Sequence, residues 1–140
     1  MASKTTIEML GSVGLFEGLS RRELGMIHKQ AREMDYPEGK TIVKEGDAGV
    51  SFHLILEGKA KVVARGRTEA TLRPGQYFGE LSLIDRGPRT ASVIATTNVR
   101  TLVLVSWEFM AMLDESPKIT RKLLLEFCSR LREERTVHTH

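Results

Sequence analysis

The spacing of apolar residues changes twice along the chain. From residue 5 to residue 35 they recur every three or four positions, which predicts two or three short helices. Ser20 and Glu23 form a capping box, so one helix is expected to begin there and to run to about Met34. His28 lies near the buried side of this helix, and we expect its hydrogen bonds to be satisfied.

Between residues 40 and 105 the pattern becomes alternating, as in half-buried strands. Turns that contain glycine separate these segments, with hairpin tips expected at Glu57-Gly58 and Arg65-Gly66. Many short strands joined in this way indicate an antiparallel sandwich or barrel. The expected strands are 41–43, 52–56, 59–63, 68–72, 92–95 and 99–104.

Helical spacing returns over residues 107–135. Ser106 is expected to cap a first helix, and Ser116-Pro117 to open a longer one with proline at its first position. Cys128 falls on the apolar stripe of the longer helix, which predicts a buried and inert thiol. That stripe consists of Ile119, Leu123, Leu124, Phe127, Cys128 and Leu131. We interpret residues 1–140 as a single domain with helices over 5–35, strands over 40–105 and helices over 107–135.

Composition narrows the class of protein. The 140 residues carry a formal net charge of +3, but glutamates interrupt the basic residues and no aromatic residues are interleaved with them. This distribution disfavours direct binding of nucleic acid. The lone cysteine suits a reducing compartment, and no apolar run has the length of a signal peptide or a membrane span. We therefore expect a cytoplasmic protein that is not inserted in a membrane.

The segment from Phe78 to Val93 contains the groups needed to bind a phosphodiester. Arg89 can offer a planar cationic fork, and backbone N–H groups around Gly79 to Leu81, at the start of a short helix, can point at the same oxygens. Glu80 could then accept a hydrogen bond from a sugar hydroxyl. The alternative is an ordinary surface ion pair between Glu80 and Arg89.

The segment Phe78-Gly79-Glu80-Leu81-Ser82-Leu83, followed after a turn by Arg89-Thr90-Ala91, resembles the phosphate-binding cassette of the cyclic nucleotide-binding domain family. The resemblance extends over about residues 13–131 and includes Glu45-Gly46-Asp47. It implies a mainly β fold: an antiparallel, jelly-roll-like β-roll of about eight strands with N-terminal helices, a short phosphate-binding helix and C-terminal helices. His53 and Ser82 stand where tyrosine and alanine are common, and we interpret both as packing variation.

The resemblance also implies roles for individual residues. Arg89 would neutralise the cyclic phosphate, Glu80 would accept from the ribose 2′-hydroxyl, and Thr90 could reach a phosphate oxygen or the amino group of guanine. The expected ligand is cAMP in preference to cGMP. The implied ligand-binding residues are Phe78, Gly79, Glu80, Leu81, Ser82, Arg89, Thr90 and Ala91, with Val62, Val63 and Leu72 as candidates for the base pocket.

No catalytic or metal-binding constellation stands out. A metal-dependent barrel would need His-x-His and a carboxylate on neighbouring strands, but His138-Thr139-His140 lies in the terminal tail without a third ligand nearby. No serine lies in a Gly-x-Ser-x-Gly turn. We therefore expect a regulatory sensor without enzyme activity, metal or cofactor, whose C-terminal helix moves on ligand binding and can form a homodimer contact. Direct binding of DNA by this chain is not expected, and the protein that it regulates is unknown. The alternative is a β-roll that has lost ligand binding and serves as a structural or protein-interaction module.

Overall fold

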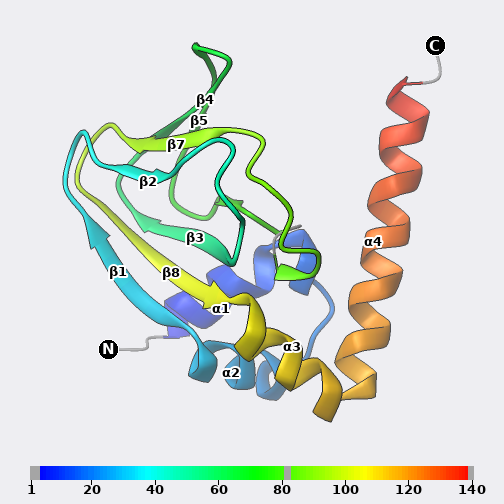
Figure 1. Ribbon diagram of the computed structural model, residues 1–140. Helices are drawn as coiled ribbons and strands as arrows, with labels where there is room; N and C mark the ends of the chain where they lie inside the picture. Colours follow the sequence, from blue (N-terminus) through cyan, green and yellow to red (C-terminus); the bar gives the residue numbers. More distant parts are fainter. Residues whose placement is uncertain (1–3, 81–82, 139–140) are drawn as a thin grey trace.

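In the computed structural model, which describes residues 4–80 and 83–138, two four-stranded antiparallel sheets face each other (Figure 1). The first sheet has the order β1-β8-β3-β6 and the second has the order β2-β7-β4-β5. The strands are β1 (Arg32–Tyr36), β2 (Thr41–Val43), β3 (Ser51–Glu57), β4 (Ala60–Ala64), β5 (Arg67–Leu72), β6 (Tyr77–Phe78), β7 (Ser92–Ala95) and β8 (Val99–Val105). The expected antiparallel β-roll is thereby confirmed.

Helices gather at one end of the roll, and a long helix rises beside it (Figure 1). They are α1 (Lys4–Ser12), the 3₁₀ turn η1 (Gly14–Phe16), α2 (Arg21–Gln30), α3 (Ser106–Glu115) and α4 (Pro117–His138). No helix in the described ranges is long and apolar enough to cross a membrane.

The capping box at the start of α2 is confirmed, but the predicted end of this helix is wrong. Ser20 Oγ accepts from the backbone N–H of Glu23, and Glu23 Oε1 accepts from that of Ser20, over 3.1 and 2.7 Å. The helix stops at Gln30, and the segment expected to continue it forms strand β1 on β8. The backbone of β1 pairs along one edge while its first four side chains stay exposed, so no apolar alternation marks it as a strand.

Two other local predictions also fail. Glu57-Gly58 is not a hairpin tip, because β3 and β4 belong to different sheets and this turn carries the chain between them. Arg65-Gly66 does join a paired hairpin, β4 with β5. His28 is not satisfied, since its Nε2 atom is buried and has no hydrogen-bond partner among the described residues.

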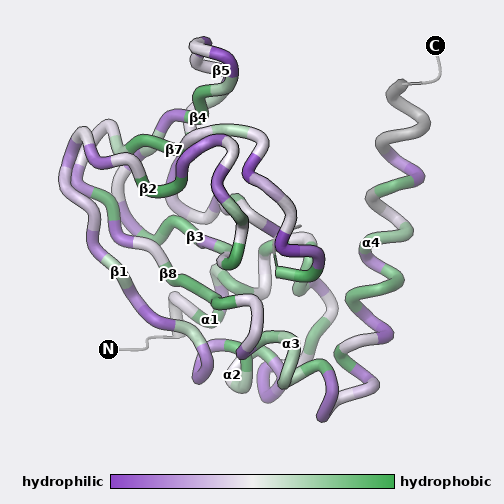
Figure 2. Tube along the Cα trace, viewed as in Figure 1, coloured by the Kyte–Doolittle hydropathy of each residue, from purple (hydrophilic) through white to green (hydrophobic). Residues whose placement is uncertain are grey.

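The main core lies between the helices and the first sheet, where apolar stretches face one another (Figure 2). Phe16 packs edge-on against both Phe52 of β3 and Phe109 of α3. A second, smaller cluster lies inside the roll and is built on Ile55, Ala60 and Val93. The helical core therefore carries most of the apolar packing, while the interior of the roll is filled less completely.

Ser106 does not cap α3 as predicted. It is the first residue of that helix, it is fully buried, and its Oγ donates to the carbonyl oxygen of Leu83 over 2.6 Å. Its backbone N–H donates to the carbonyl oxygen of Val50 over 2.8 Å. Ser116 does cap α4: its Oγ accepts from the N–H of Ile119 over 3.3 Å, and Pro117 occupies the first helical position.

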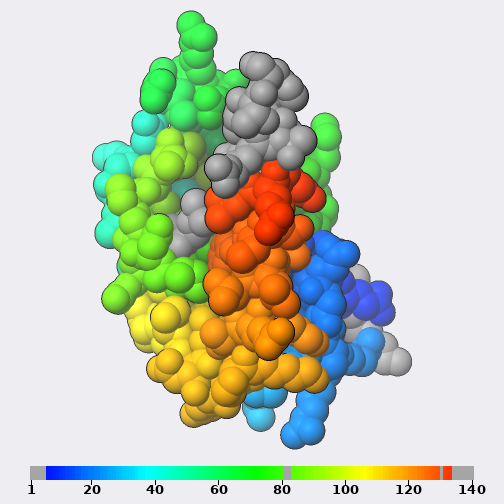
Figure 3. Space-filling view, turned by 90° about the vertical axis from the view of Figure 1, so that its right-hand side faces the viewer, coloured from blue at the N-terminus to red at the C-terminus, as the bar shows by residue number. Residues whose placement is uncertain are grey.

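Helix α4 packs along a narrower face than its apolar stripe suggests. Ile119 and Leu123 are buried and Phe127 packs partly, but Leu124 and Leu131 are 62% and 59% exposed. Cys128 is exposed as well, so the prediction of a buried thiol is wrong. In Figure 3, the orange and red atoms of α4 stand beside the N-terminal segment in blue and above α3 in gold.

Ionic contacts attach α4 to the N-terminal helices. Lys122 Nζ donates to the carbonyl oxygen of Gly18 over 2.9 Å and to Glu23 Oε1 over 3.1 Å. Lys118 Nζ lies 3.8 Å from Glu23 Oε2. The backbone hydrogen bond from Ser20, aided by both lysines, lowers the pKa of Glu23 to about 2. The carboxylate that caps α2 therefore also holds the first half of α4.

Candidate functional site

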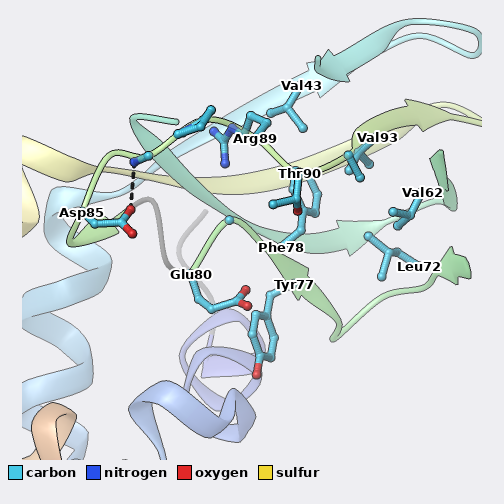
Figure 4. Close-up of a pocket in the computed structure, with 14 residues that line it drawn as sticks. Val43, Val62, Leu72, Tyr77, Phe78, Glu80, Asp85, Arg89, Thr90 and Val93 are labelled. Atoms are coloured by element: carbon cyan, nitrogen blue, oxygen red, sulfur yellow. Dashed lines mark hydrogen bonds between the residues drawn. The ribbon is translucent and has the colours of Figure 1, made fainter. Parts of the chain in front are cut away.

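A cavity of about 270 Å³ opens inside the roll, between the second sheet and the segment that follows β6 (Figure 4). Val62, Leu72 and Val93 form an apolar end, while Glu80 and Arg89 lie toward the other end. The cavity is lined by Val43, Val62, Leu72, Tyr77, Phe78, Gly79, Glu80, Asp85, Gly87, Pro88, Arg89, Thr90, Ala91 and Val93.

Most of the residues predicted from the sequence to form the site line this cavity. Among the predicted cassette residues, Phe78, Gly79, Glu80, Arg89, Thr90 and Ala91 do so, whereas Leu81 and Ser82 lie outside the described residues. The 3.4 Å bond from Leu83 N to the carbonyl oxygen of Glu80 is the described part of the turn expected as a short helix.

Two of the three residues predicted for the base pocket line the cavity. Val62 and Leu72 line the cavity, but Val63 does not, because successive side chains of a strand point to opposite faces. Val43, Tyr77 and Val93 line it without having been predicted. The valines come from strands β2 and β7, which pair with each other although they are far apart in the sequence.

Gly79 is required by its surroundings. Its φ angle of +85° lies in the left-handed region that favours glycine. A Cβ atom here would lie 2.6 Å from Nη1 of Arg89 and 2.6 Å from the carbonyl oxygen of Ser51. The missing side chain therefore lets the guanidinium approach the backbone at the polar end of the cavity.

Arg89 is held at both its backbone and its side chain. Its N–H donates to the carbonyl oxygen of Asp47 over 2.8 Å, and its carbonyl oxygen accepts from the N–H of Gly46 over 2.9 Å. Its Nη2 donates to Ser51 Oγ over 3.1 Å. Partial burial lowers the pKa of Arg89, but an arginine side chain stays charged in proteins. The cavity thus contains a fixed cation.

The turn expected between Ile84 and Pro88 returns the chain to the cavity. The backbone N–H of Gly87 donates to Asp85 Oδ1 over 2.8 Å, the bond drawn in Figure 4. The carbonyl oxygen of Gly87 accepts from Gly49, and Pro88 forms a bridge with Ala48. These contacts fix the position from which Arg89 reaches toward Gly79.

His53 lies directly behind Arg89, although the sequence suggested only packing variation for it. The side chain is 3% exposed, and its Nε2 lies 3.0 Å from Ser51 Oγ. Burial, together with the nearby charge of Arg89, lowers the pKa of His53 to about 3. The imidazole is therefore neutral at physiological pH. Spacing alone gave no sign of this contact, because Ser51 and His53 precede Arg89 by more than thirty residues.

The site combines a cation, a half-buried carboxylate, a hydroxyl and an apolar end within one cavity. A ligand that suits it has an anionic group at Arg89, hydroxyl donors for Glu80, and a flat apolar part for the valines. These features define a class of β-roll that binds small anionic ligands.

Comparison with known proteins identifies the family. The family model described as "Cyclic nucleotide-binding domain" matches residues 33–116. The chain belongs to the cyclic nucleotide-binding domain family.

Relatives and solved structures agree with this placement. The CRP-like cAMP-activated global transcriptional regulator of Mycobacterium tuberculosis is 33% identical over 130 residues, which cover 89% of this chain and 58% of that protein. The cyclic AMP receptor protein of Thermus thermophilus is 34% identical over 124 residues, which cover 85% of this chain and 57% of that protein. The chain therefore spans under three fifths of the length of either relative.

The crystal structure of the N-terminal domain of a transcriptional regulator from Streptomyces coelicolor is similar over almost the whole chain. It superposes with a TM-score of 0.87 at 31% identity, and the match covers 94% of this chain and 96% of that one.

Proposed function

We propose that this chain is a regulatory sensor domain that binds cAMP in preference to cGMP and has no enzyme activity of its own. The observation that carries the proposal is the position of Arg89 and Glu80 at the polar end of an otherwise apolar cavity. The cyclic phosphate would lie against Arg89 and the backbone at Gly79, because the guanidinium provides charge-assisted hydrogen bonds. Glu80 would accept from the ribose 2′-hydroxyl.

The preference for adenine follows from the opposite end of the cavity. Val43, Val62, Leu72 and Val93 offer no side-chain partner for the carbonyl and amino groups by which guanine differs from adenine. Burying those groups without hydrogen bonds is unfavourable. Among the described lining residues, Thr90 and Tyr77 carry the hydroxyls that could compensate for them in cGMP. The names of the two relatives described above, which both refer to cAMP, support the same ligand.

The output would pass through α4. Leu124, Leu125 and Leu131 are each more than half exposed, and this supports a homodimer in which the α4 helices of two copies cover these leucines. A helix that begins at Pro117, after the short break at Ser116, can also change its angle at little cost in regular structure. Ligand binding would shift an existing equilibrium of this helix.

Titration calorimetry with cAMP and then with cGMP tests the proposal. The wild-type protein should bind cAMP more tightly than cGMP, and Arg89→Ala should weaken cAMP binding about tenfold or more, because the phosphate would enter the cavity without its cation. Arg67→Ala, at an exposed position on β5 outside the cavity, is the matched control and should bind as the wild type does.

Two outcomes would contradict the proposal. Binding of neither nucleotide by a folded wild-type protein would favour the alternative of a structural or protein-interaction module. Binding of cGMP at least as tightly as cAMP would overturn the preference for adenine alone.

A further inference from the structure

A row of hydrogen-bonded side chains extends from the cavity across the inner face of the first sheet. Arg89 Nη2 lies 3.1 Å from Ser51 Oγ, which lies 3.0 Å from His53 Nε2. His53 Nδ1 lies 3.4 Å from Thr101 Oγ1. The row therefore links the cation of the cavity to strands β3 and β8 of the first sheet.

A guanidinium can only donate, so Ser51 Oγ accepts from Arg89. We assign the hydroxyl proton of Ser51 to the bond with His53 Nε2 and the ring proton to Nδ1, which then donates to Thr101 Oγ1. Hydrogen bonds aligned in this way strengthen one another.

The His53 ring cannot turn away from this row. It stacks on Phe78 with ring centroids 4.8 Å apart and planes at 5°, and it meets Tyr36 edge-on at 6.3 Å. Phe78 is paired with His53 across strands β3 and β6 and directly precedes Gly79. The same stack therefore aligns the start of the cassette and the imidazole behind Arg89.

The other guanidinium nitrogen lies against Gly79 of the cassette. Nη2 is used by Ser51, whereas Nη1 lies over the position that a Cβ of Gly79 would occupy. That is where the cyclic phosphate would lie under the function proposed above. Holding Nη2 from behind fixes the plane of the fork before the ligand arrives, which reduces the ordering that binding requires.

We propose that His53 is a positioning residue for phosphate binding: through Ser51, its neutral imidazole holds Arg89 in the orientation that receives the phosphate. The identity of the ligand in this inference rests on the proposed function. The fixed orientation of the Arg89 side chain, in contrast, is expected in the ligand-free protein as well.

The first test therefore uses the ligand-free protein. The heteronuclear nuclear Overhauser effect of the Arg89 Nε–H group should match that of rigid backbone in the wild type. It should fall in Ser51→Ala and in His53→Phe, which keeps the stack on Phe78 but has no nitrogen. His53→Gln, whose amide oxygen can accept from Ser51, should restore it, and His28→Phe on α2 should leave it unchanged. An Arg89 side chain that stays equally ordered in Ser51→Ala and His53→Phe would overturn the inference.

The second test measures affinity for cAMP. Ser51→Ala and His53→Phe should each weaken binding about fivefold, the size expected for the net contribution of one ordinary hydrogen bond. The double variant should lose no more than either single variant, and neither change should matter in an Arg89→Ala background. Additive losses would contradict the inference, because they would mean that the two residues act separately.

The two tests separate this inference from the proposed function. If the wild type binds neither nucleotide, the proposed function fails. The mobility of the Arg89 side chain in the ligand-free variants still decides whether His53 positions it. If His53→Phe does not fold, Ser51→Ala gives the same decision, because it removes the link between His53 and Arg89.

Discussion

Gly79 and Arg89 are in such close contact that a Cβ atom on Gly79 would lie 2.6 Å from Nη1 of the arginine. The glycine belongs to the chain leaving β6, and the arginine returns after the turn of residues 84–88. Their contact brings the two ends of the cassette together at the polar end of the cavity, and four predictions test this arrangement and its surroundings.

Gly79→Ala should impair both folding stability and ligand binding. Gly75→Ala is the matched control, because Gly75 has a φ of +91° but nothing within 4 Å of the added Cβ. Both variants should lose about 1 kcal/mol of unfolding free energy for the left-handed backbone. Gly79→Ala should lose roughly 1–3 kcal/mol more from the clash, and its affinity for cAMP should fall about tenfold or more. Equal unfolding free energies in urea and equal calorimetric affinities for the two variants would contradict the assigned contact.

Glu80 should discriminate by the sugar of the ligand. The 2′-hydroxyl of cAMP would donate a hydrogen bond to the half-buried carboxylate of Glu80. Because 2′-deoxy-cAMP lacks this hydroxyl, it should bind more weakly than cAMP. Glu80→Gln should narrow this difference, whereas Glu69→Gln, at an exposed position on β5, should not. Competition titrations with both nucleotides provide the measurement. The ribose contact assigned to Glu80 is wrong if the wild type binds both nucleotides equally well.

His53 should make the protein less stable as the pH falls. Its pKa is about 3 in the folded protein, against 6.5 as the ordinary value, so between these values the unfolded chain binds the additional proton. The unfolding free energy should therefore decrease by up to about 1.4 kcal/mol per pH unit below pH 6.5. The charged Arg89 and the phenol of Tyr36 face the ring, and neither changes its charge in this range.

Glu23 adds an acid-sensitive contribution at lower pH. Its pKa is lowered from 4.5 to about 2, so its stabilisation is complete above pH 4.5 and is lost as the pH falls toward 2. Urea denaturation between pH 4.5 and 6.5 therefore separates the contribution of His53 from that of Glu23, and the slope should be reduced in His53→Phe. An unchanged slope in that variant would show that another group is responsible.

Ligand binding should change the amide hydrogen exchange of α4. If the helix moves toward the base, saturating cAMP should slow amide hydrogen exchange over residues 117–131 as well as in the cassette, while β5 should be unaffected. Lys122→Met should speed exchange of α4 in the free protein, because it removes the contacts with Gly18 and Glu23. Protection limited to residues 78–92 would mean a binding domain without a moving helix.

The local signals in the sequence predicted most of the fold, and the failures have physical causes. Strand β1 was missed because its exposed side chains carry no alternation and its pairing with β8 is remote in sequence. Strand β6 has only two residues, Tyr77–Phe78, which is too short for any period. Cys128 was misplaced because α4 packs along only part of its apolar stripe.

The candidate site was predictable where it is contiguous. The cassette residues have characteristic types at fixed spacing, and those described line the cavity. Other parts of the site come from strands that are distant in sequence: Val43, Ser51 and His53. They lie close to the cassette only because of strand pairing, which no local sequence pattern predicts. A buried histidine beside a cation is revealed only by three-dimensional contacts.

Ser106 has a mechanical consequence for the domain. Through its N–H and its hydroxyl, this one residue joins the chain just before β3, the cassette at Leu83 and the start of α3. Hydrogen bonds of one residue therefore tie these three segments together, so that a displacement of Leu83 would act directly on the start of α3. The next break in regular structure is at Ser116, between α3 and α4.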